Sequence, residues 1–199
     1  AGDWSSDVCS SDLFNKKSLN PILAEAIFPQ KTREKWVEYF NSQDYDVILT
    51  TASLSLRLAM IAPRLKAATI GWQHNCYDGY LHVKPVVFWQ QENLLQQYLP
   101  NLDRYIVLSD YDKRDYMEKL GIDCEVKINP RSFVSEKKCD VKSKRFLMAT
   151  RFVYAKGLDL MMESFEEFCK EDSEWELDII GDGDLFDQIR ADAKKRHLE

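Results

Sequence analysis

The chain has 199 residues, of which 45% are hydrophobic and 30% charged, and its formal net charge is −6. This length accommodates one domain of ordinary size or two small ones, and the mild acidity gives no electrostatic reason to expect a nucleic-acid partner. The most apolar region, residues 47–72, contains Arg57, Arg64 and Lys66, so it lacks the roughly 20 uninterrupted apolar residues of a membrane span.

Residues 1–13 differ in character from the sequence that follows. They mix Asp, Ser, Trp and Cys without helical or strand periodicity, and residues 3–13 resemble one reading frame of a widely used short-read sequencing adapter. We therefore expect an artefactual stretch and exclude it from fold reasoning, with a natural flexible N-terminus as the alternative. Its removal takes away Asp3, Asp7 and Asp12 and brings the formal charge from −6 to −3.

The next part of the sequence predicts a parallel α/β fold. Segment 19–41 has a helical pattern that Pro29 interrupts. From Asp46 onward short β-rich runs alternate with longer helical runs, which is typical of a parallel sheet with crossover helices. The expected strands are 46–51, 68–72, 104–109 and 125–129, and the expected helices are 53–62, 86–99 and 111–120.

One of these helices has clear ends. Ser109 or Asp110 can accept hydrogen bonds from the free amides at the start of helix 111–120. Gly121 suits the left-handed turn that ends a helix. The boundaries of this helix are therefore the best defined in the chain.

Segment 130–143 indicates a division of the chain. It starts with Pro, is charged and lacks periodicity, so it reads as a connection between domains rather than as a surface loop within one. The strand and helix pattern then restarts, with expected strands 145–151 and 175–181 and expected helices from about 158 to 170 and from about 185 onward. We expect domains at 14–132 and 144–199 joined by a linker at 133–143.

We expect both domains to be doubly wound, Rossmann-like and incomplete. The second has only two strands, which are too few for a sheet that is stable alone, so it is expected to be truncated. Cys76, Cys124, Cys139 and Cys169 have neither zinc-ligand nor redox-motif spacing, which favours reduced thiols in a cytosolic protein and no metal site.

The candidate binding residues lie where strand 145–151 meets the following helix. The strand ends in Arg151, and Lys156 and Gly157 stand directly before the helix. Free amides at a helix start carry partial positive charge, and glycine lets a ligand approach the backbone closely. Arg can bind a diphosphate bidentately and Lys adds a movable charge. From spacing alone, solvated surface cations are the more common explanation.

The surrounding motifs resemble the C-terminal domain of GT-B glycosyltransferases of family 4. The shared order is a strand ending in Arg, a short loop, Lys-Gly, a helix, a strand and Gly-Asp-Gly. It appears here as FLMATR, Lys156-Gly157, LDLMMESFEEF, WELDII and Gly181-Asp182-Gly183. Upstream, IGWQHNCYDGY, RYIVLSDYDKRDYMEKLGI and KINP are similar to parts of the family's N-terminal domain.

The resemblance implies a role for several residues. Arg151, Lys156 and Gly157 would bind the donor diphosphate, and His74 would lie near the donor sugar as a catalytic residue. Gly181, Asp182 and Gly183 would chiefly form a tight turn that needs glycine dihedral angles, close to the donor. Asn75, Tyr77, Asp78 and Tyr80 are candidates for lining the cleft or the acceptor site, whereas His82 and His197 are expected to be structural.

The resemblance also implies an activity. It is the transfer of a sugar from a nucleoside diphosphate sugar to a glycan, lipid or other acceptor, with retention of configuration and without a cofactor or an obligatory metal. The implied setting is polysaccharide biosynthesis in the cytoplasm, with peripheral association at the inner face of the membrane left open. A pair of Glu residues that family members carry further downstream lies beyond this sequence, so the fragment is expected to be inactive. The alternatives are a nucleotide-sugar epimerase or hydrolase and a non-catalytic nucleotide-binding module, while the lack of GxGxxG disfavours a classical dinucleotide-binding domain.

Overall fold

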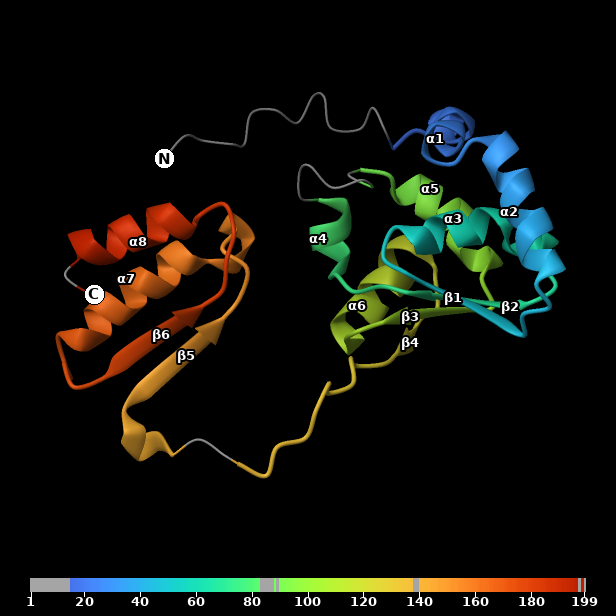
Figure 1. The fold of residues 1–199 in the computed structure, drawn as a ribbon. Coiled ribbons are helices and arrows are strands. Elements are labelled where there is room, and N and C mark those ends of the chain that lie inside the picture. Colours follow the sequence, from blue (N-terminus) through green and yellow to red (C-terminus); the bar gives the residue numbers. More distant parts are fainter. Residues whose placement is uncertain (1–14, 83–87, 89, 138–139, 197, 199) are drawn as a thin grey trace. The chain divides into compact units, whose positions relative to one another are not determined.

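The computed structural model describes residues 15–82, 88, 90–137, 140–196 and 198 (Figure 1). The chain forms two compact units, of which the first ends at Arg131 and the second begins at Ser132. The stretch 1–13 and His197 lie outside the described residues, as do residues 138–139 of the expected linker.

The first unit is built on a parallel four-stranded sheet in the order β1-β2-β3-β4. Its strands are β1 (Val47–Thr51), β2 (Ala68–Trp72), β3 (Arg104–Val107) and β4 (Glu125–Val126). Val47 pairs with Ala68, and Ile70 pairs with Arg104. Because the strands run in one direction, their carboxyl ends meet at one edge of the sheet, which is the edge where ligands bind in open α/β folds.

Helices cover this sheet (Figure 1). They are η2 (Lys17–Leu19), α1 (Asn20–Ile27), α2 (Gln30–Ser42), α3 (Leu54–Ile61), η3 (Ala62–Arg64), α4 (Tyr77–Leu81), α5 (Glu92–Tyr98), η4 (Leu99–Asn101), α6 (Asp110–Asp115) and η5 (Tyr116–Leu120). Pro29 separates α1 from α2, as predicted. Helix α3 is the most deeply packed, because only Leu54 and Arg57 of its residues are not buried.

Several element boundaries differ from those expected. The strand expected at 125–129 ends at Val126, because its partner β3 ends at Val107. Lys127 still donates its amide to the Val107 carbonyl at 3.0 Å, but Ile128 is 78% exposed. The helix expected at 111–120 begins one residue earlier and continues as the π-helical turn η5. Of the helix expected at 86–99, residues 86, 87 and 89 lie outside the described residues, and α5 begins at Glu92.

A tyrosine pair joins β3 to η5 in the first unit, and a carboxyl group joins β3 to β2. The hydroxyl groups of Tyr105 and Tyr116 lie 3.4 Å apart in the core, and burial raises the pKa of Tyr116 to about 12. At the amino end of β3, Asp103 accepts hydrogen bonds from the Thr69 amide at 2.7 Å and from its Oγ1 at 2.9 Å. These bonds lower the pKa of the Asp103 carboxyl group and tie the β3 end to β2.

The second unit is a smaller strand and helix alternation. Its elements are η6 (Val141–Ser143), β5 (Arg145–Ala149), η7 (Tyr154–Lys156), α7 (Leu158–Cys169), β6 (Glu176–Ile180) and α8 (Phe186–Lys195). Strands β5 and β6 are parallel, with Met148 opposite Ile179. The expected α/β fold with parallel sheets is confirmed in both units.

Helices α7 and α8 pack on one face of β5 and β6 (Figure 1). The core there consists of Phe152, Leu158, Met162 and Ile189, with Met148, Met161, Ile179 and Leu185 partly buried around it. On the other face, Leu147 is 66% exposed and Ile180 is 60% exposed. No helix among the described residues of either unit is long and apolar enough to cross a membrane.

The cysteines differ in accessibility. Cys76, Cys124 and Cys169 are free thiols, whereas Cys9 and Cys139 lie outside the described residues. Cys124 is 2% exposed, and burial raises the pKa of its thiol to about 12. Cys76 is exposed. Since the thiolate is the reactive species, the two residues should respond differently to an alkylating reagent.

We expect iodoacetamide at pH 8 to modify Cys76 in the folded chain and to leave Cys124 unmodified, because at that pH the Cys124 thiol stays protonated as well as buried. Peptide mass spectrometry measures the two sites separately. In urea both should react at similar rates, and equal modification of both sites in the folded chain would contradict the burial of Cys124.

Candidate functional site

The segment between β5 and α7 places Arg151 and Lys156 on one short turn. Its backbone is closed by hydrogen bonds from the Val153 amide to the Arg151 carbonyl at 2.9 Å and from the Lys156 amide to the Val153 carbonyl at 3.0 Å. Both cationic side chains are exposed, and neither has a hydrogen-bond or ion-pair partner within the described part of the chain. The turn therefore presents two free positive charges on a fixed backbone.

Helix α7 begins at this turn without a side-chain cap. Gly157 precedes it with φ 62° and ψ 36°, a left-handed conformation that glycine adopts at low cost. The first amide to find a partner within the helix is that of Met161, which donates to the Gly157 carbonyl at 3.0 Å. The amides before it in the first turn remain available to an anion, as at other helix starts.

The turn at Gly181, Asp182 and Gly183 holds the backbone on both sides of Arg151. The amide of Thr150 donates to the Ile180 carbonyl at 2.9 Å, and the amide of Phe152 donates to the Asp182 carbonyl at 2.8 Å. A further bond of 3.0 Å runs from the Leu185 amide to the Phe152 carbonyl. Phe152 itself is 4% exposed and stacks on Phe186 with 5.6 Å between ring centroids.

Positions 181 and 183 of this turn require glycine for two reasons: a neighbouring backbone carbonyl lies too close for a Cβ atom, and φ is positive. Gly181 has φ 154°, and a Cβ atom there would lie 1.8 Å from the Thr150 carbonyl oxygen. Gly183 has φ 147°, and a Cβ atom there would lie 2.7 Å from the Phe152 carbonyl oxygen. The sequence spacing indicated a glycine turn, but only the fold shows that the turn lies against the segment bearing Arg151.

We expect Gly181→Ala to lower the free energy of unfolding of the second unit by roughly 2–5 kcal/mol, because the new methyl group collides with the Thr150 carbonyl and the backbone conformation is strained. Urea unfolding followed through the NMR amide signals of residues 144–196 measures this. Gly157→Asn is the matched control: its Cβ meets nothing within 4 Å, and Asn tolerates the left-handed conformation, so its effect should stay below about 1 kcal/mol. Equal stability of the two variants would show that the close approach is not required.

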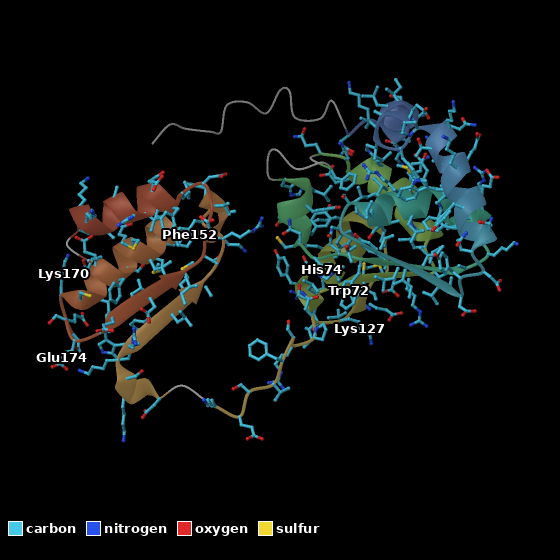
Figure 2. All side chains as sticks on the ribbon, viewed as in Figure 1. Trp72, His74, Lys127, Phe152, Lys170 and Glu174 are labelled. Atoms are coloured by element: carbon cyan, nitrogen blue, oxygen red, sulfur yellow. The ribbon has the colours of Figure 1, made fainter. Side chains whose placement is uncertain are left out.

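In the first unit, His74 follows β2 at the carboxyl edge of the sheet. The backbone amide of His74 donates a hydrogen bond to Oε1 of the fully buried Gln73 at 3.0 Å. The exposed imidazole stacks on Trp72 with 5.3 Å between ring centroids and 25° between ring planes (Figure 2). His74 is thus held at the sheet edge with its ring open to solvent.

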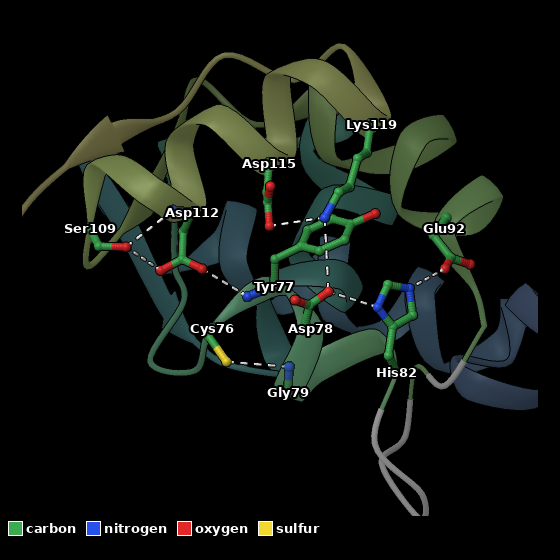
Figure 3. A network of polar contacts seen from close by, with 10 residues as sticks. All are labelled: Cys76, Tyr77, Asp78, Gly79, His82, Glu92, Ser109, Asp112, Asp115 and Lys119. Atoms are coloured by element: carbon green, nitrogen blue, oxygen red, sulfur yellow. Dashed lines mark hydrogen bonds and ion pairs between the residues drawn. The ribbon is translucent and has the colours of Figure 1, made fainter. Parts of the chain in front are cut away.

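The residues after His74 form helix α4 and a polar network around it (Figure 3). His82 places Nδ1 2.8 Å from Asp78 Oδ1 and Nε2 3.0 Å from Glu92 Oε1, so it joins α4 to the start of α5. Lys119 lies 3.0 Å from Asp115 and 3.9 Å from Asp78. The hydrogen bond to Asp115 raises the pKa of the Lys119 ammonium group.

The candidates for a cleft or acceptor lining separate into two groups. Tyr77 is 1% exposed and Tyr80 is 8% exposed, so both are core residues. The Tyr77 ring packs against Tyr116, and the Tyr80 ring packs against Phe88. Burial, with smaller contributions from Glu92 and other neighbours, raises the pKa of Tyr77. Asn75 and Asp78 are exposed. Among the described residues, no group of three or more His, Cys, Asp or Glu side chains could hold a metal ion.

Comparison with protein families gives a match for the second unit. Residues 132–199 match the family described as Glycosyl transferases group 1. The comparison with curated proteins gives no match. The expected resemblance to glycosyltransferases is therefore confirmed by a family model for this part of the chain, whereas membership of family 4 stays a prediction.

Solved structures show the fold of a larger part of the chain. TarM has 17% identity and a TM-score of 0.67, with 83% of this chain and 34% of TarM covered. A TarM variant from S. aureus, in complex with fondaparinux, alpha-GlcNAc-glycerol and UDP, has 17% identity, a TM-score of 0.65 and coverages of 84% and 35%. The pneumococcal O-GlcNAc transferase GtfA, in complex with UDP and GlcNAc, has 14% identity, a TM-score of 0.58 and coverages of 81% and 34%.

These matches confirm the expected GT-B fold. The chain spans about a third of the length of the solved proteins it matches. At these identities the likeness establishes how the backbone is arranged, and the chemistry has to be argued from the residues of this chain.

Proposed function

We propose that this chain belongs to a glycosyltransferase that moves a sugar from a nucleoside diphosphate sugar to an acceptor, and that Arg151, Lys156 and the start of α7 bind the donor diphosphate. The observation that supports this most directly is the turn between β5 and α7. It presents two cations without partners in the described residues beside an uncapped helix start, within the residues that match a glycosyltransferase family.

The proposed chemistry follows from where negative charge develops. When the bond between the sugar and the diphosphate breaks, the departing diphosphate gains charge, and donors placed beforehand stabilise it by a few kcal/mol each. Arg151 can contact two phosphate oxygens at once, while Lys156 supplies a compact charge and the α7 amides supply hydrogen bonds. Both side chains are exposed, so water and salt screen them until the donor excludes solvent.

The proposal extends to the identity of the donor. Two of the structures with this fold contain UDP, one with GlcNAc and one with alpha-GlcNAc-glycerol. UDP-GlcNAc is therefore the donor to test first, with a glycan or lipid-linked acceptor, retention of configuration and no metal or organic cofactor. His74 would contact the donor sugar, and the enzyme would act in the cytoplasm, either free or at the inner face of the membrane.

We expect Lys156→Ala and Arg151→Ala each to weaken UDP binding by roughly ten- to hundredfold, the loss that follows removal of a hydrogen bond to a charged group. Isothermal titration calorimetry of the chain with UDP measures the dissociation constants, and GDP tests the choice of base. The dissociation constant of uridine, which has no phosphate, should be the same in both variants as in the unmodified chain.

Lys195→Ala is the matched control for these two variants. Lys195 is also an exposed lysine of the second unit, but it lies at the end of α8 rather than on the turn before α7. Its substitution should leave the affinity for UDP unchanged. UDP binding that is as strong in the Lys156 and Arg151 variants as in the control would refute the assigned site.

We expect His74→Ala to weaken binding of UDP-GlcNAc by roughly tenfold and to leave binding of UDP nearly unchanged, because a contact with the sugar exists only in the sugar nucleotide. Calorimetry with the two ligands gives the comparison. His82→Gln should change neither affinity, since His82 contacts Asp78 and Glu92. An equal loss for both ligands in His74→Ala would place His74 elsewhere than at the sugar.

A further inference from the structure

Asp112 is a buried carboxyl group that links α6 to the segment carrying His74. It is 5% exposed, and one of its oxygens, Oδ1, accepts a hydrogen bond from the Tyr77 amide at 2.8 Å (Figure 3). The other, Oδ2, accepts from Ser109 Oγ at 2.6 Å. Burial of a carboxyl group is tolerated only when such partners replace water, so both bonds constrain where Asp112 lies.

The α6 side of this link is rigid. Ser109 caps the helix, since its Oγ accepts from the Asp112 amide at 3.1 Å while its hydroxyl donates to the Asp112 carboxyl group. Asp112 is therefore fixed at both its backbone and its side chain to the first turn of α6. The strand β3, which ends at Val107, connects that turn directly to the central sheet.

The α4 side of the link depends on outside support. Helix α4 has five residues, too few to be stable alone, and Tyr77 is its first residue. The Asp112 carboxyl group thus caps α4 from another helix, at the end where a negative charge is favourable. Other contacts from η5, such as Lys119 Nζ at 4.5 Å from the Tyr77 ring centroid, act on side chains rather than on this backbone end.

Short-range contacts close the segment around Tyr77 into a compact loop. The Gly79 amide donates to Cys76 Sγ at 3.3 Å, and Asn75 Nδ2 donates to the Gly79 carbonyl at 3.4 Å. A Cβ atom on Gly79 would lie 2.9 Å from Cys76 Sγ, so the loop closes tightly at a glycine. The compact segment 75–79 thus joins the Tyr77 amide to the end of the chain segment that bears His74, which directly precedes Asn75.

We propose that Asp112 is a positioning residue for His74, which it holds at the sheet edge through the Tyr77 amide without contacting a substrate. The significance of His74 for the donor sugar rests on the proposed function, whereas the placement of its loop by Asp112 does not. Removal of the Asp112 carboxyl group should release the start of α4 and change the environment of the His74 ring.

The test compares Asp112→Ala, Asp112→Asn and the control Asp123→Ala by NMR of the isotope-labelled chain. We expect Asp112→Ala to shift or broaden the His74 ring signals and to speed hydrogen exchange of the Tyr77 amide by roughly ten- to hundredfold. Asp112→Asn keeps an oxygen for the Tyr77 amide, and the Ser109 hydroxyl can rotate to accept from the new amide, so both measurements should return toward those of the unmodified chain. Asp123, whose side chain is 74% exposed and pairs with Lys113 at 3.2 Å, should be replaceable without effect.

His74 signals that stay unchanged in a folded Asp112→Ala chain would overturn the proposal. If that variant does not fold, hydrogen exchange is measured in the unmodified chain. The Tyr77 amide must then exchange more slowly than the amides of Asn75 and Cys76, and fast exchange at Tyr77 overturns the proposal. Calorimetry with UDP separates this test from the proposed function. A chain that binds no UDP but shows the His74 changes contradicts the proposed function and supports the role of Asp112.

Discussion

The backbone position of Arg151 is fixed by hydrogen bonds of its two neighbours, and no contact of its own side chain contributes among the described residues. Thr150 and Phe152 are both bonded to the segment that follows β6, so the residue between them has little freedom to change its backbone position. The two glycines at 181 and 183 make that close approach sterically allowed. A site that binds phosphate needs cations placed in advance, because ordering them at the moment of binding would consume part of the binding energy.

In the first unit, side chains rather than backbone groups hold the loop that bears His74. In the loop after β2, the His74 amide donates to the fully buried Gln73, and the Tyr77 amide donates to Asp112 of α6. Polar groups at these positions are costly to bury, and their partners are specific, so the loop has one favoured arrangement. Both units therefore hold the backbone of an exposed candidate residue, Arg151 or His74, with hydrogen bonds from neighbouring segments.

The sequence predicted the parts of this arrangement that depend on local signals. The strand at 68–72 and the end of α6 and η5 at Gly121 were readable, since a short apolar run and a glycine after a helical pattern are strong local markers. The cationic turn was also visible, because Arg151, Lys156 and Gly157 stand close together in the chain.

The rest depended on contacts between distant residues. The link between Asp112 and Tyr77 spans 35 positions. The spacing of Ser109 and Asp112 fits a helix start, but nothing in it shows that the Asp112 side chain reaches Tyr77. Burial of Tyr77 and Tyr80 could not be read from a segment that is otherwise polar. The shortening of β4 to Glu125–Val126 likewise reflects the loss of a neighbouring strand beyond Val107, not the β-propensity of residues 127–129.

The uncovered face of β5 and β6 has a practical consequence for handling the protein. Leu147 and Ile180 lie on it with most of their surface in water, and a two-stranded sheet also has unpaired backbone groups along both outer edges. Apolar side chains beside unpaired edges favour contact between molecules as concentration rises. Contact between molecules through this patch should lower the solubility of the polypeptide. A charged substitution is better placed at Leu147 than at Ile180, because the Ile180 carbonyl accepts the hydrogen bond from the Thr150 amide next to Arg151.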